Sequence, residues 1–318
     1  MNVITRILSL VVAPGGDIWR STLQYGALLL LPALGGVISE RSGVTNIAME
    51  GMMLTGAFFA VVADLAWHSA LLGVLVAIFA GGAMSLIHAV VSIRFKADQI
   101  VSGVAINIIA VGLTVFLLNR IYGIADIGHV DPQNLIPNLN VPLLSKIPWI
   151  GPVFFTQNVV VYLALFFLVV VHIFLFRTRL GLRLRAVGEH PSAADTAGIN
   201  VYRIRYGAVI ASGLLSGLAG AFLAIGLSNT FVNNMTEGRG YIALAAMIFG
   251  KWTPVGSFIA CLIFGFGQAV YDNNSTIQVS PYLLSMLPYV LTLVVLAGLV
   301  GRSTPPAADG IPYEPGGE

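Results

Sequence analysis

Charged side chains are scarce in this sequence. Aspartate, glutamate, lysine and arginine make up only 9% of the 318 residues, whereas a soluble domain carries roughly 25%. So few charges cannot cover the water-facing surface of a chain this long. Hydrophobic residues account for 57% of the sequence, and they gather in runs close to the roughly 20 residues that span a bilayer as a helix. Because backbone groups in lipid must pair internally, the sequence predicts an all-α integral membrane protein.

Other absences narrow the possible functions. The net charge is only +2, which gives no support for nucleic-acid binding. The single cysteine, Cys261, cannot form an intrachain disulfide, and its apolar neighbours indicate a small packing residue. Residues 1–13 lack a clear small-residue cleavage site, so a cleavable signal peptide is not expected.

Residues that would carry chemistry are also missing. His68 and His88 stand apart without a metal-ligand pattern, and no nucleophile–base set is visible, so the sequence predicts neither a metal site nor catalytic residues. Gly250-Lys251 superficially resembles the end of a phosphate-binding loop. The upstream glycine is absent, however, and Trp252 replaces the required serine or threonine. A nucleotide site is therefore not expected in this chain.

The apolar runs predict a bundle of about nine to ten transmembrane helices. Tyr241–Gly250 is too short to span a bilayer alone, and the N-terminal patch Ile4–Ala13 is an interfacial helix or a partial span. The nine segments are Arg20–Ile38, Met49–Trp67, Ala70–Ile93, Ile100–Leu118, Gln157–Phe176, Tyr206–Gly226, Tyr241–Gly250, Pro254–Tyr271 and Tyr282–Val300.

The placement of arginine predicts which face lies inside. Residues 177–205 carry six arginines, more than any other loop, so we place this loop in the cytoplasm. Residues 119–156, which are rich in proline, then form a long outside loop. Residues 1–300 are expected to form one transmembrane domain, followed by a disordered cytoplasmic tail over residues 301–318.

A short sequence motif that occurs twice bears on the predicted number of membrane crossings. The pattern N-x-x-x-E-G occurs at Asn46–Gly51 and again at Asn233–Gly238. Five crossings separate the two copies, so they face opposite sides of the membrane, as two inverted five-helix repeats would place them. A repeat favours ten crossings with the N-terminus inside. Only three residues match, so a chance repeat, with nine crossings and the N-terminus outside, stays open.

Polar residues and glycines interrupt the hydrophobic stretch between residues 35 and 53. One interpretation is a short cytoplasmic loop in which Glu40 and Arg41 are solvated. The other is a discontinuous helix whose ends line a pathway, with Asn46 and Glu50 sharing a face at i and i+4. Asn107, in the middle of an apolar run, makes either an interhelical hydrogen bond or a contact to a polar solute.

Four aromatic side chains could stack on a flat ring, although membrane packing is the commoner role for each. They are Phe58, Phe59, Phe231 and Tyr241.

The arginine-rich loop carries its own helix signals. Pro191 suits a first helical position, the next residues favour helix, and Gly198 suits a C-terminal cap. The segment is either an ordinary positive-inside loop or a docking element for a cytoplasmic partner.

Several stretches resemble the permease subunits of bacterial ABC importers for simple sugars, branched-chain amino acids and nucleosides. The stretches Ile38–Met52 and Leu184–Asn200 are most similar to the nucleoside branch, and Val101–Asn107 and Gly238–Trp252 add to the match. The resemblance covers most of the chain except the outside loop and both termini.

The resemblance implies a type II ABC importer-like fold in the bacterial inner membrane and a transport role without enzymatic activity. A second, homologous permease subunit would complete the pathway, two ATPase subunits would bind ATP with magnesium, and an extracytoplasmic solute-binding protein would deliver the solute. This chain would bind no cofactor itself. The residues expected to couple it to the ATPase are Gly188, Glu189, His190, Pro191, Ala193, Ala194, Ala197 and Gly198.

The interrupted hydrophobic stretch, the asparagine in the middle of an apolar run and the aromatic residues suggest where the solute passes. The residues expected along the pathway are Asn46, Glu50, Asn107, Phe58 and Phe231. Nucleosides are the expected solute class. The alternatives are a simple sugar such as a pentose, an ion-coupled secondary transporter, or an intramembrane enzyme.

Overall fold

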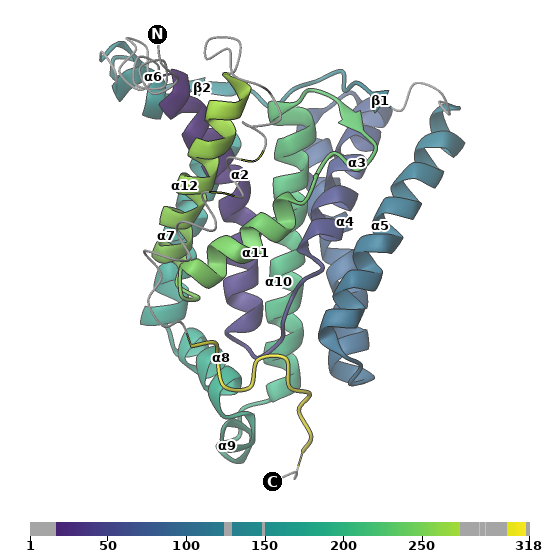
Figure 1. Cartoon of the computed structure of the whole chain (residues 1–318), viewed down its shortest axis with the longest axis vertical. Helices are drawn as coiled ribbons and strands as arrows, with labels where there is room; N and C mark the ends of the chain where they lie inside the picture. Colours follow the sequence, from purple (N-terminus) through teal and green to yellow (C-terminus); the bar gives the residue numbers. More distant parts are fainter. Residues whose placement is uncertain are drawn as a thin grey trace.

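The computed structural model describes residues 17–123, 129–147, 150–273 and 304–315, together with the single positions 286 and 290 (Figure 1). The described part is a helical bundle, which confirms the predicted all-α membrane fold. Within it, seven helical stretches are long and apolar enough to cross a membrane. They are α2 (Asp17–Glu40), α3 (Met49–Trp67), α4 (Ala70–Ala89) extended by a π-helical turn (Val90–Arg94), α5 (Gln99–Tyr122), α7 (Val159–Arg177), α10 (Val201–Phe222) extended by a second π-helical turn (Leu223–Leu227), and α12 (Pro254–Asp272).

One further apolar helix, α11 (Arg239–Phe249), has only 11 residues. At 1.5 Å per residue it is about 16 Å long, roughly half of a hydrocarbon core. The short segment predicted from the sequence is therefore a half-crossing. The segments Ile4–Ala13 and Tyr282–Val300 lie outside the described residues, apart from the two single positions. The total number of crossings and the side of the N-terminus therefore stay predictions.

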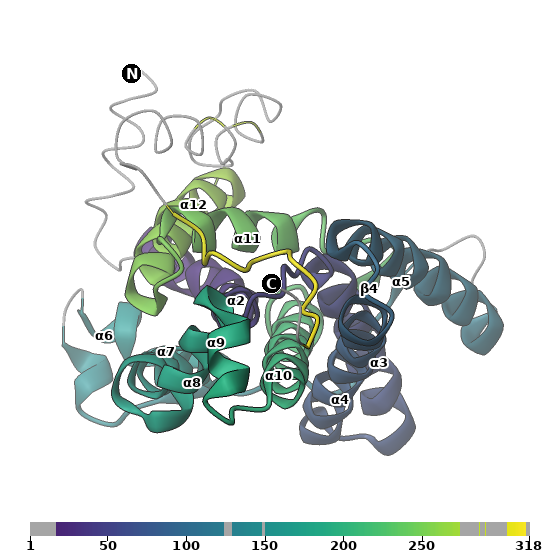
Figure 2. The ribbon, with the colours of Figure 1, turned by 90° about the horizontal axis from the view of Figure 1, so that it is seen from below.

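Three helices form the centre of the bundle. About four-fifths of α2, α3 and α10 is buried, compared with about a third of α4, α5 and α7. The outer helices present large apolar side chains such as Phe79, Phe116 and Phe166, as helices that face lipid do. Seen from below, α5 stands at one edge of the bundle, on the far side from α6 (Ile150–Phe154) and α7 (Figure 2).

The described part of the proline-rich residues 119–156, predicted to lie outside, covers one end of the bundle, here called the outer end. The opposite end carries the arginine-rich residues 177–205 and is called the cytoplasmic end after the same prediction. Two short antiparallel pairs form at the outer end. β1 (His129–Val130), in the loop, pairs with β4 (Phe231–Val232), which follows α10, and β2 (Asn138–Asn140) pairs with β3 (Thr156–Asn158). A 3₁₀ turn (Leu144–Lys146) follows β2. Asp64 fixes the loop to α3, because its carboxylate accepts hydrogen bonds from the backbone amides of Gln133 and Asn134, at 2.6 and 2.9 Å.

The two copies of the repeated motif follow helices that end at opposite ends of the described bundle. α2 packs along α12, and α10 packs along α4. α2 ends at the cytoplasmic side and leads through non-helical residues to α3, whereas α10 ends at the outer side and leads through non-helical residues to α11. Each copy of the motif therefore stands where a helix begins inside the bundle.

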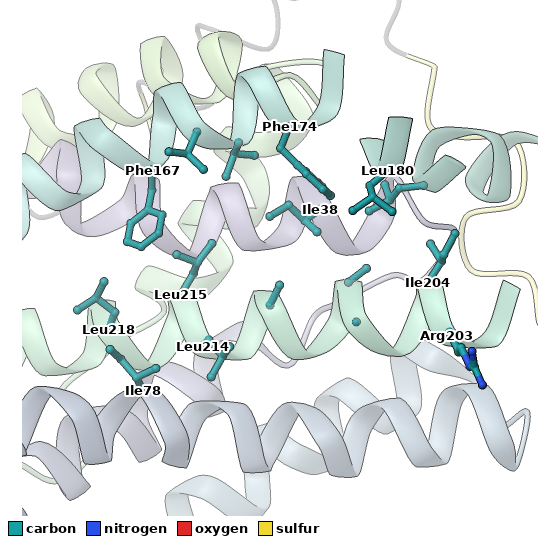
Figure 3. A pocket seen from close by; sticks show the side chains of 16 residues that line it. Ile38, Ile78, Phe167, Phe174, Leu180, Arg203, Ile204, Leu214, Leu215 and Leu218 are labelled. Atoms are coloured by element: carbon teal, nitrogen blue, oxygen red, sulfur yellow. The ribbon is translucent and has the colours of Figure 1, made fainter. Parts of the chain in front are cut away.

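An apolar cavity of about 650 Å³ opens beside α10. Side chains of α2, α4, α7 and α10 line it, including Ile38, Ile78, Phe167 and Leu215, with Arg203 at its cytoplasmic end (Figure 3). With almost no polar group on its walls, this cavity does not suit a polar solute.

The expectation of a disordered tail is wrong for residues 304–315. These residues have a defined path against the cytoplasmic end, where Ala308 and Tyr313 are buried and the Ala308 amide donates to the Gly188 carbonyl, at 2.9 Å. The composition indicated disorder because it is rich in proline and glycine. It could not reveal that the rest of the chain offers a surface for those residues.

Small residues allow α10 to touch its neighbours closely. A Cβ added at Gly220 would lie 2.1 Å from the Met53 carbonyl of α3, and one at Gly217 would lie 2.3 Å from the Ala77 carbonyl of α4. Such backbone contacts are the usual basis of helix packing in membranes.

We therefore expect Gly220→Ala to destabilise the bundle by about 1–3 kcal/mol, because the added methyl group must push α3 and α10 apart. Thermal unfolding in detergent measures the effect. Gly207 lies on the same helix with open space around it, so Gly207→Ala is the matched control. Equal melting temperatures for the two variants would contradict this view of the helix contact.

Candidate functional site

Two non-helical segments enter the bundle from opposite ends. Residues 41–48, the inner re-entrant segment, link α2 to α3, and residues 228–238, the outer re-entrant segment, link α10 to α11. Asn46 Nδ2 donates to the Ser212 hydroxyl at 2.8 Å. Ser212 lies eleven residues beyond the first residue of α10, or about 16 Å along that helix. The inner segment therefore reaches the middle of the bundle.

The two segments meet at the carboxylate of Glu50. This side chain, on the first turn of α3, accepts hydrogen bonds from the backbone amides of Gly238, at 2.8 Å, and Gly240, at 2.6 Å. These amides belong to the start of α11, where unpaired N–H groups and the helix dipole favour a negative charge. A Cβ at Gly240 would lie 2.5 Å from the Glu50 backbone. Only a glycine allows the starts of α3 and α11 to come this close.

Asn107 on α5 ties the same junction from the side. Its Oδ1 accepts from the Gly51 amide at 2.8 Å, and its Nδ2 donates to the Ile47 carbonyl at 3.1 Å and to the Tyr241 hydroxyl at 2.8 Å. One amide side chain therefore joins the inner segment, α3 and α11.

The inner segment is also held by its own polar residues and by α4. Ser39 Oγ donates to the Val44 carbonyl at 2.7 Å, and Asn46 Oδ1 accepts from the Ala48 amide at 3.1 Å. His88 Nε2 lies 3.1 Å from the Thr45 carbonyl. His88 is thus a buried, hydrogen-bonded residue of the bundle.

Glu40 is buried and Arg41 is only partly exposed, so the interpretation as a simple loop with both residues solvated is wrong. Glu40 is buried and accepts a hydrogen bond from Trp252 Nε1 at 2.5 Å, while Arg41 Nε donates to the Trp252 carbonyl at 3.0 Å. The loop interpretation failed because nothing local in the sequence indicates that the turn after α11 returns to this point.

The structure brings three of the five expected pathway residues together. The side-chain hydrogen bonds of Asn46, Glu50 and Asn107 all go to groups of this chain, and the three side chains are buried. Phe58 and Phe231 are also buried, and they pack edge to face with ring centroids 5.2 Å apart. In this conformation Asn46, Glu50 and Asn107 shape the junction, Phe58 and Phe231 pack α3 against the outer re-entrant segment, and none of the five presents a free polar group to a solute.

Exposed polar side chains lie instead on the outer re-entrant segment. Asn229, Asn233, Asn234 and Glu237 are exposed, and Glu237 directly precedes the glycine bound by Glu50. Irregular backbone at membrane depth is tolerated only where protein covers it or water lines it. Sequence reasoning noted Asn233 and Glu237 only as parts of the repeated motif. Their spacing gave no sign that they face outward.

Tyr241 follows this segment at the start of α11. The residue is 44% exposed, while its hydroxyl is fixed by Asn107. Of the four aromatic residues considered from the sequence, Phe58, Phe59 and Phe231 pack against one another, whereas Tyr241 keeps an accessible ring.

At the opposite end, the arginine-rich loop folds as the sequence predicts. α8 (Arg179–Glu189) is followed directly by α9 (Pro191–Thr196), with Pro191 at the first helical position and Gly198 at a left-handed φ of 78°. α9 forms the lowest helix of the molecule in Figure 1. The exposed members of the predicted coupling set are Glu189, His190, Ala193, Ala197 and Gly198.

Two members of that set face inward. Gly188 is buried, and a Cβ there would lie 2.2 Å from the Arg41 carbonyl, so α8 touches the inner segment directly. Ala194 is buried among Val187, Val201 and Tyr313. These two residues join α8 and α9 to the bundle, whereas the exposed residues are free to meet a partner.

Residues 19–296 match the family model described as the permease component of the branched-chain amino acid transport system. The chain belongs to this permease family. It is 44% identical to the guanosine ABC transporter permease protein NupQ of Bacillus subtilis, over 98% of both chains. It is 41% identical to the nucleoside ABC transporter permease protein NupC of Lactococcus lactis, over 98% of this chain and 99% of the relative. The putative glucose ABC transporter permease protein TsgC13 of Haloferax volcanii is 34% identical, over 89% and 92% of the two chains.

No solved structure matches the permease. Family membership and the seven apolar helices of the described part make it a multi-pass membrane protein and a permease subunit of an ABC importer. The permease is a transport component rather than an enzyme. The match extends across both re-entrant segments, α8, α9 and α11.

We expect Glu50→Ala to destabilise the permease more than Glu50→Gln, since alanine removes both acceptors from the start of α11. Each lost charge-assisted hydrogen bond costs about 1.5–3 kcal/mol. Thermal unfolding of the purified permease gives the ranking, and Asp17→Asn, at an exposed carboxylate of α2, serves as control. A melting temperature for Glu50→Ala equal to that of Asp17→Asn would show that the junction does not depend on this carboxylate.

Proposed function

We propose that this permease forms the membrane pathway for nucleosides in an ATP-driven importer of the bacterial inner membrane. The observation that carries the solute class is identity above 40%, along nearly the whole chain, to two permeases described as transporting guanosine or nucleosides. The putative glucose permease at 34% identity makes a simple sugar the second candidate.

The proposed route runs along the outer re-entrant segment and Tyr241. Glu237 pairs with Arg239, at 3.3 Å, and its side chain is still 71% exposed beside a junction in the middle of the bundle. An ionised carboxylate facing lipid there would cost about 2.5–3.5 kcal/mol on the mildest scale. Water or a second permease subunit must therefore cover this face. A nucleoside offers hydroxyl and amide-like groups for the asparagines and a flat ring for Tyr241.

Asn46, Glu50, Asn107, Phe58 and Phe231 keep a role in this proposal, but an indirect one. Asn46, Glu50 and Asn107 fix the junction of α3 and α11, whereas Phe58 and Phe231 pack α3 against the outer re-entrant segment. Together they set the position of the residues that meet the solute. Their hydrogen bonds and ring contacts inside the chain support this role.

The remaining partners follow from the same proposal. A separate ATPase subunit binds ATP with magnesium and docks on α8 and α9, an extracytoplasmic solute-binding protein delivers the nucleoside, and a second permease subunit completes the pathway. Exposure of α9 at the cytoplasmic end supports the docking site.

Uptake assays separate the two candidate solutes. Proteoliposomes that contain the complete transporter should accumulate labelled guanosine when ATP is supplied, and unlabelled glucose or ribose should not compete. Accumulation of glucose or ribose with no effect of guanosine would overturn the nucleoside assignment.

Thiol labelling tests the route. Replacing Cys261, the only cysteine, with alanine gives a background in which Asn233→Cys and Glu237→Cys are expected to react with a hydrophilic thiol reagent. Guanosine should slow the reaction. Phe79 is 70% exposed on the apolar helix α4, so Phe79→Cys is the lipid-facing control and should stay unreactive. Equal reactivity at all three positions would contradict the route.

Bulk on the exposed face of α9 should disrupt docking. We expect Ala197→Trp to reduce copurification of the ATPase while the permease stays folded in the membrane, because Ala197 is exposed. Gly207→Ala serves again as the control. Normal copurification and ATP-driven uptake for Ala197→Trp would count against α9 as the docking element.

A further inference from the structure

Residues 304–315, here called the strap, cross the cytoplasmic end of the bundle beside α8 and α9 (Figure 2). Two hydrogen bonds attach the strap to the end of α8. The Ala308 amide donates to the Gly188 carbonyl at 2.9 Å, and the Ala307 amide donates to Glu189 Oε2 at 3.2 Å. The strap is therefore in contact with the element proposed to meet the ATPase.

The strap is also attached to the inner re-entrant segment. Asp309 Oδ1 accepts a hydrogen bond from the Thr45 hydroxyl at 3.0 Å. Gly43, at a left-handed φ of 87°, leaves room for the Ala308 carbonyl, which would lie 3.0 Å from an added Cβ. Glu50, whose carboxylate accepts a hydrogen bond at the start of α11, lies only four residues beyond Asn46 of this segment.

Arg205 joins the strap and the inner segment in one contact. The residue is only 2% exposed, although it lies near the start of the membrane-spanning helix α10. Nε donates to the Ser42 carbonyl at 3.2 Å, and Nη1 donates to the Ile311 carbonyl at 3.0 Å. A buried guanidinium without such partners would be strongly destabilising. The strap therefore supplies one of the two hydrogen-bond acceptors of Arg205, whose Nη2 has no hydrogen-bond partner among the described residues.

Charge adds to this attachment. Burial raises the pKa of the Asp309 carboxyl to about 6, while Thr45, the Gly310 amide, the Arg205 guanidinium and Glu40 favour the charged form. The Asp309 carboxyl and the buried Arg205 guanidinium each favour the charged form of the other. The carboxylate and the guanidinium attract each other where little water screens them.

Apolar contacts hold the far end of the strap. Tyr313 is buried among Val187, Ala194 and Val201, and its ring lies 5.7 Å from that of Tyr202. These residues come from α8, α9 and α10, so Tyr313 binds the strap to the coupling element as well. The exposed pair Lys96–Glu314, at 2.6 Å, lies at the solvent edge.

We propose that the strap is a positioning element for energy coupling, which carries a displacement of α8 and α9 to the inner re-entrant segment and so to Glu50 at the junction of α3 and α11. The proposal rests on the proposed docking of an ATPase at α9. Asp309 and Arg205 are positioning residues in it, since neither touches a solute or a nucleotide.

The first test measures guanosine uptake per ATP hydrolysed by the complete transporter in proteoliposomes. Asp309→Ala and a chain that ends at residue 303 should keep ATPase copurification and ATP hydrolysis but lose about tenfold in this ratio, as the loss of a charged hydrogen bond predicts. Glu314→Gln removes only the exposed ion pair and should stay within about twofold of the wild type. A wild-type ratio in both strap variants would overturn the proposal.

The second test asks whether attachment itself is required. In the Cys261→Ala background, Thr45→Cys with Asp309→Cys should show the same low ratio, and a short bifunctional thiol cross-linker should restore it. A merely structural loss would not be rescued by reattachment. If the cross-linked protein stays at the low ratio or stops transporting, the strap does not transmit motion in this way.

Copurification of the ATPase separates failure of this proposal from failure of the proposed function. If Ala197→Trp leaves ATPase binding and uptake intact, α9 is not the docking element and the proposed docking fails. If Ala197→Trp abolishes ATPase binding but the strap variants keep a wild-type ratio, only the role of the strap is wrong.

Discussion

The carboxylate of Glu50 and the backbone amides of Gly238 and Gly240 connect the two halves of the described bundle. One partner stands at the start of α3, which the chain reaches from the cytoplasmic side, and the other stands at the start of α11, which the chain reaches from outside. A helix that begins inside a membrane needs partners for its first N–H groups. Glu50 supplies them to α11, and Asn107 supplies one to α3 through the Gly51 amide.

This constraint explains the distribution of polar residues in an otherwise apolar chain. Ser212, Asn46 and Asn107 are buried because they hydrogen-bond the inner segment or the start of a half-crossing helix. The outer segment differs, because its asparagines and Glu237 remain exposed. A polar solute therefore finds hydrogen-bonding groups on the outer re-entrant segment, while the inner re-entrant segment holds the starts of the helices in place. In the proposed function, the ATPase acts on the side of the inner segment.

The sequence predicted the helices well, because long apolar runs, the arginine-rich loop and the proline of α9 are local signals. The motif repeated at Asn46–Gly51 and Asn233–Gly238 also predicted an inverted arrangement of the two halves of the chain. The side chains that meet were harder to predict. Glu50 looked like a pathway residue because an ionisable group beside an apolar run usually marks a site, but its partners lie about 190 residues further along the chain. Arg205 and the strap were missed for the same reason, since their partners lie in segments that are distant in sequence.

The central claim is that motion at the cytoplasmic helices reaches the outer re-entrant segment through the junction at Glu50. Spin labels at Arg183→Cys on α8 and Asn233→Cys, both exposed positions, allow a direct distance measurement in the Cys261→Ala background. Pulsed electron paramagnetic resonance on the complete transporter should show that the distance distribution between the two labels shifts when ATP and magnesium are added. A distribution that stays unchanged while the transporter hydrolyses ATP and imports guanosine would contradict the account.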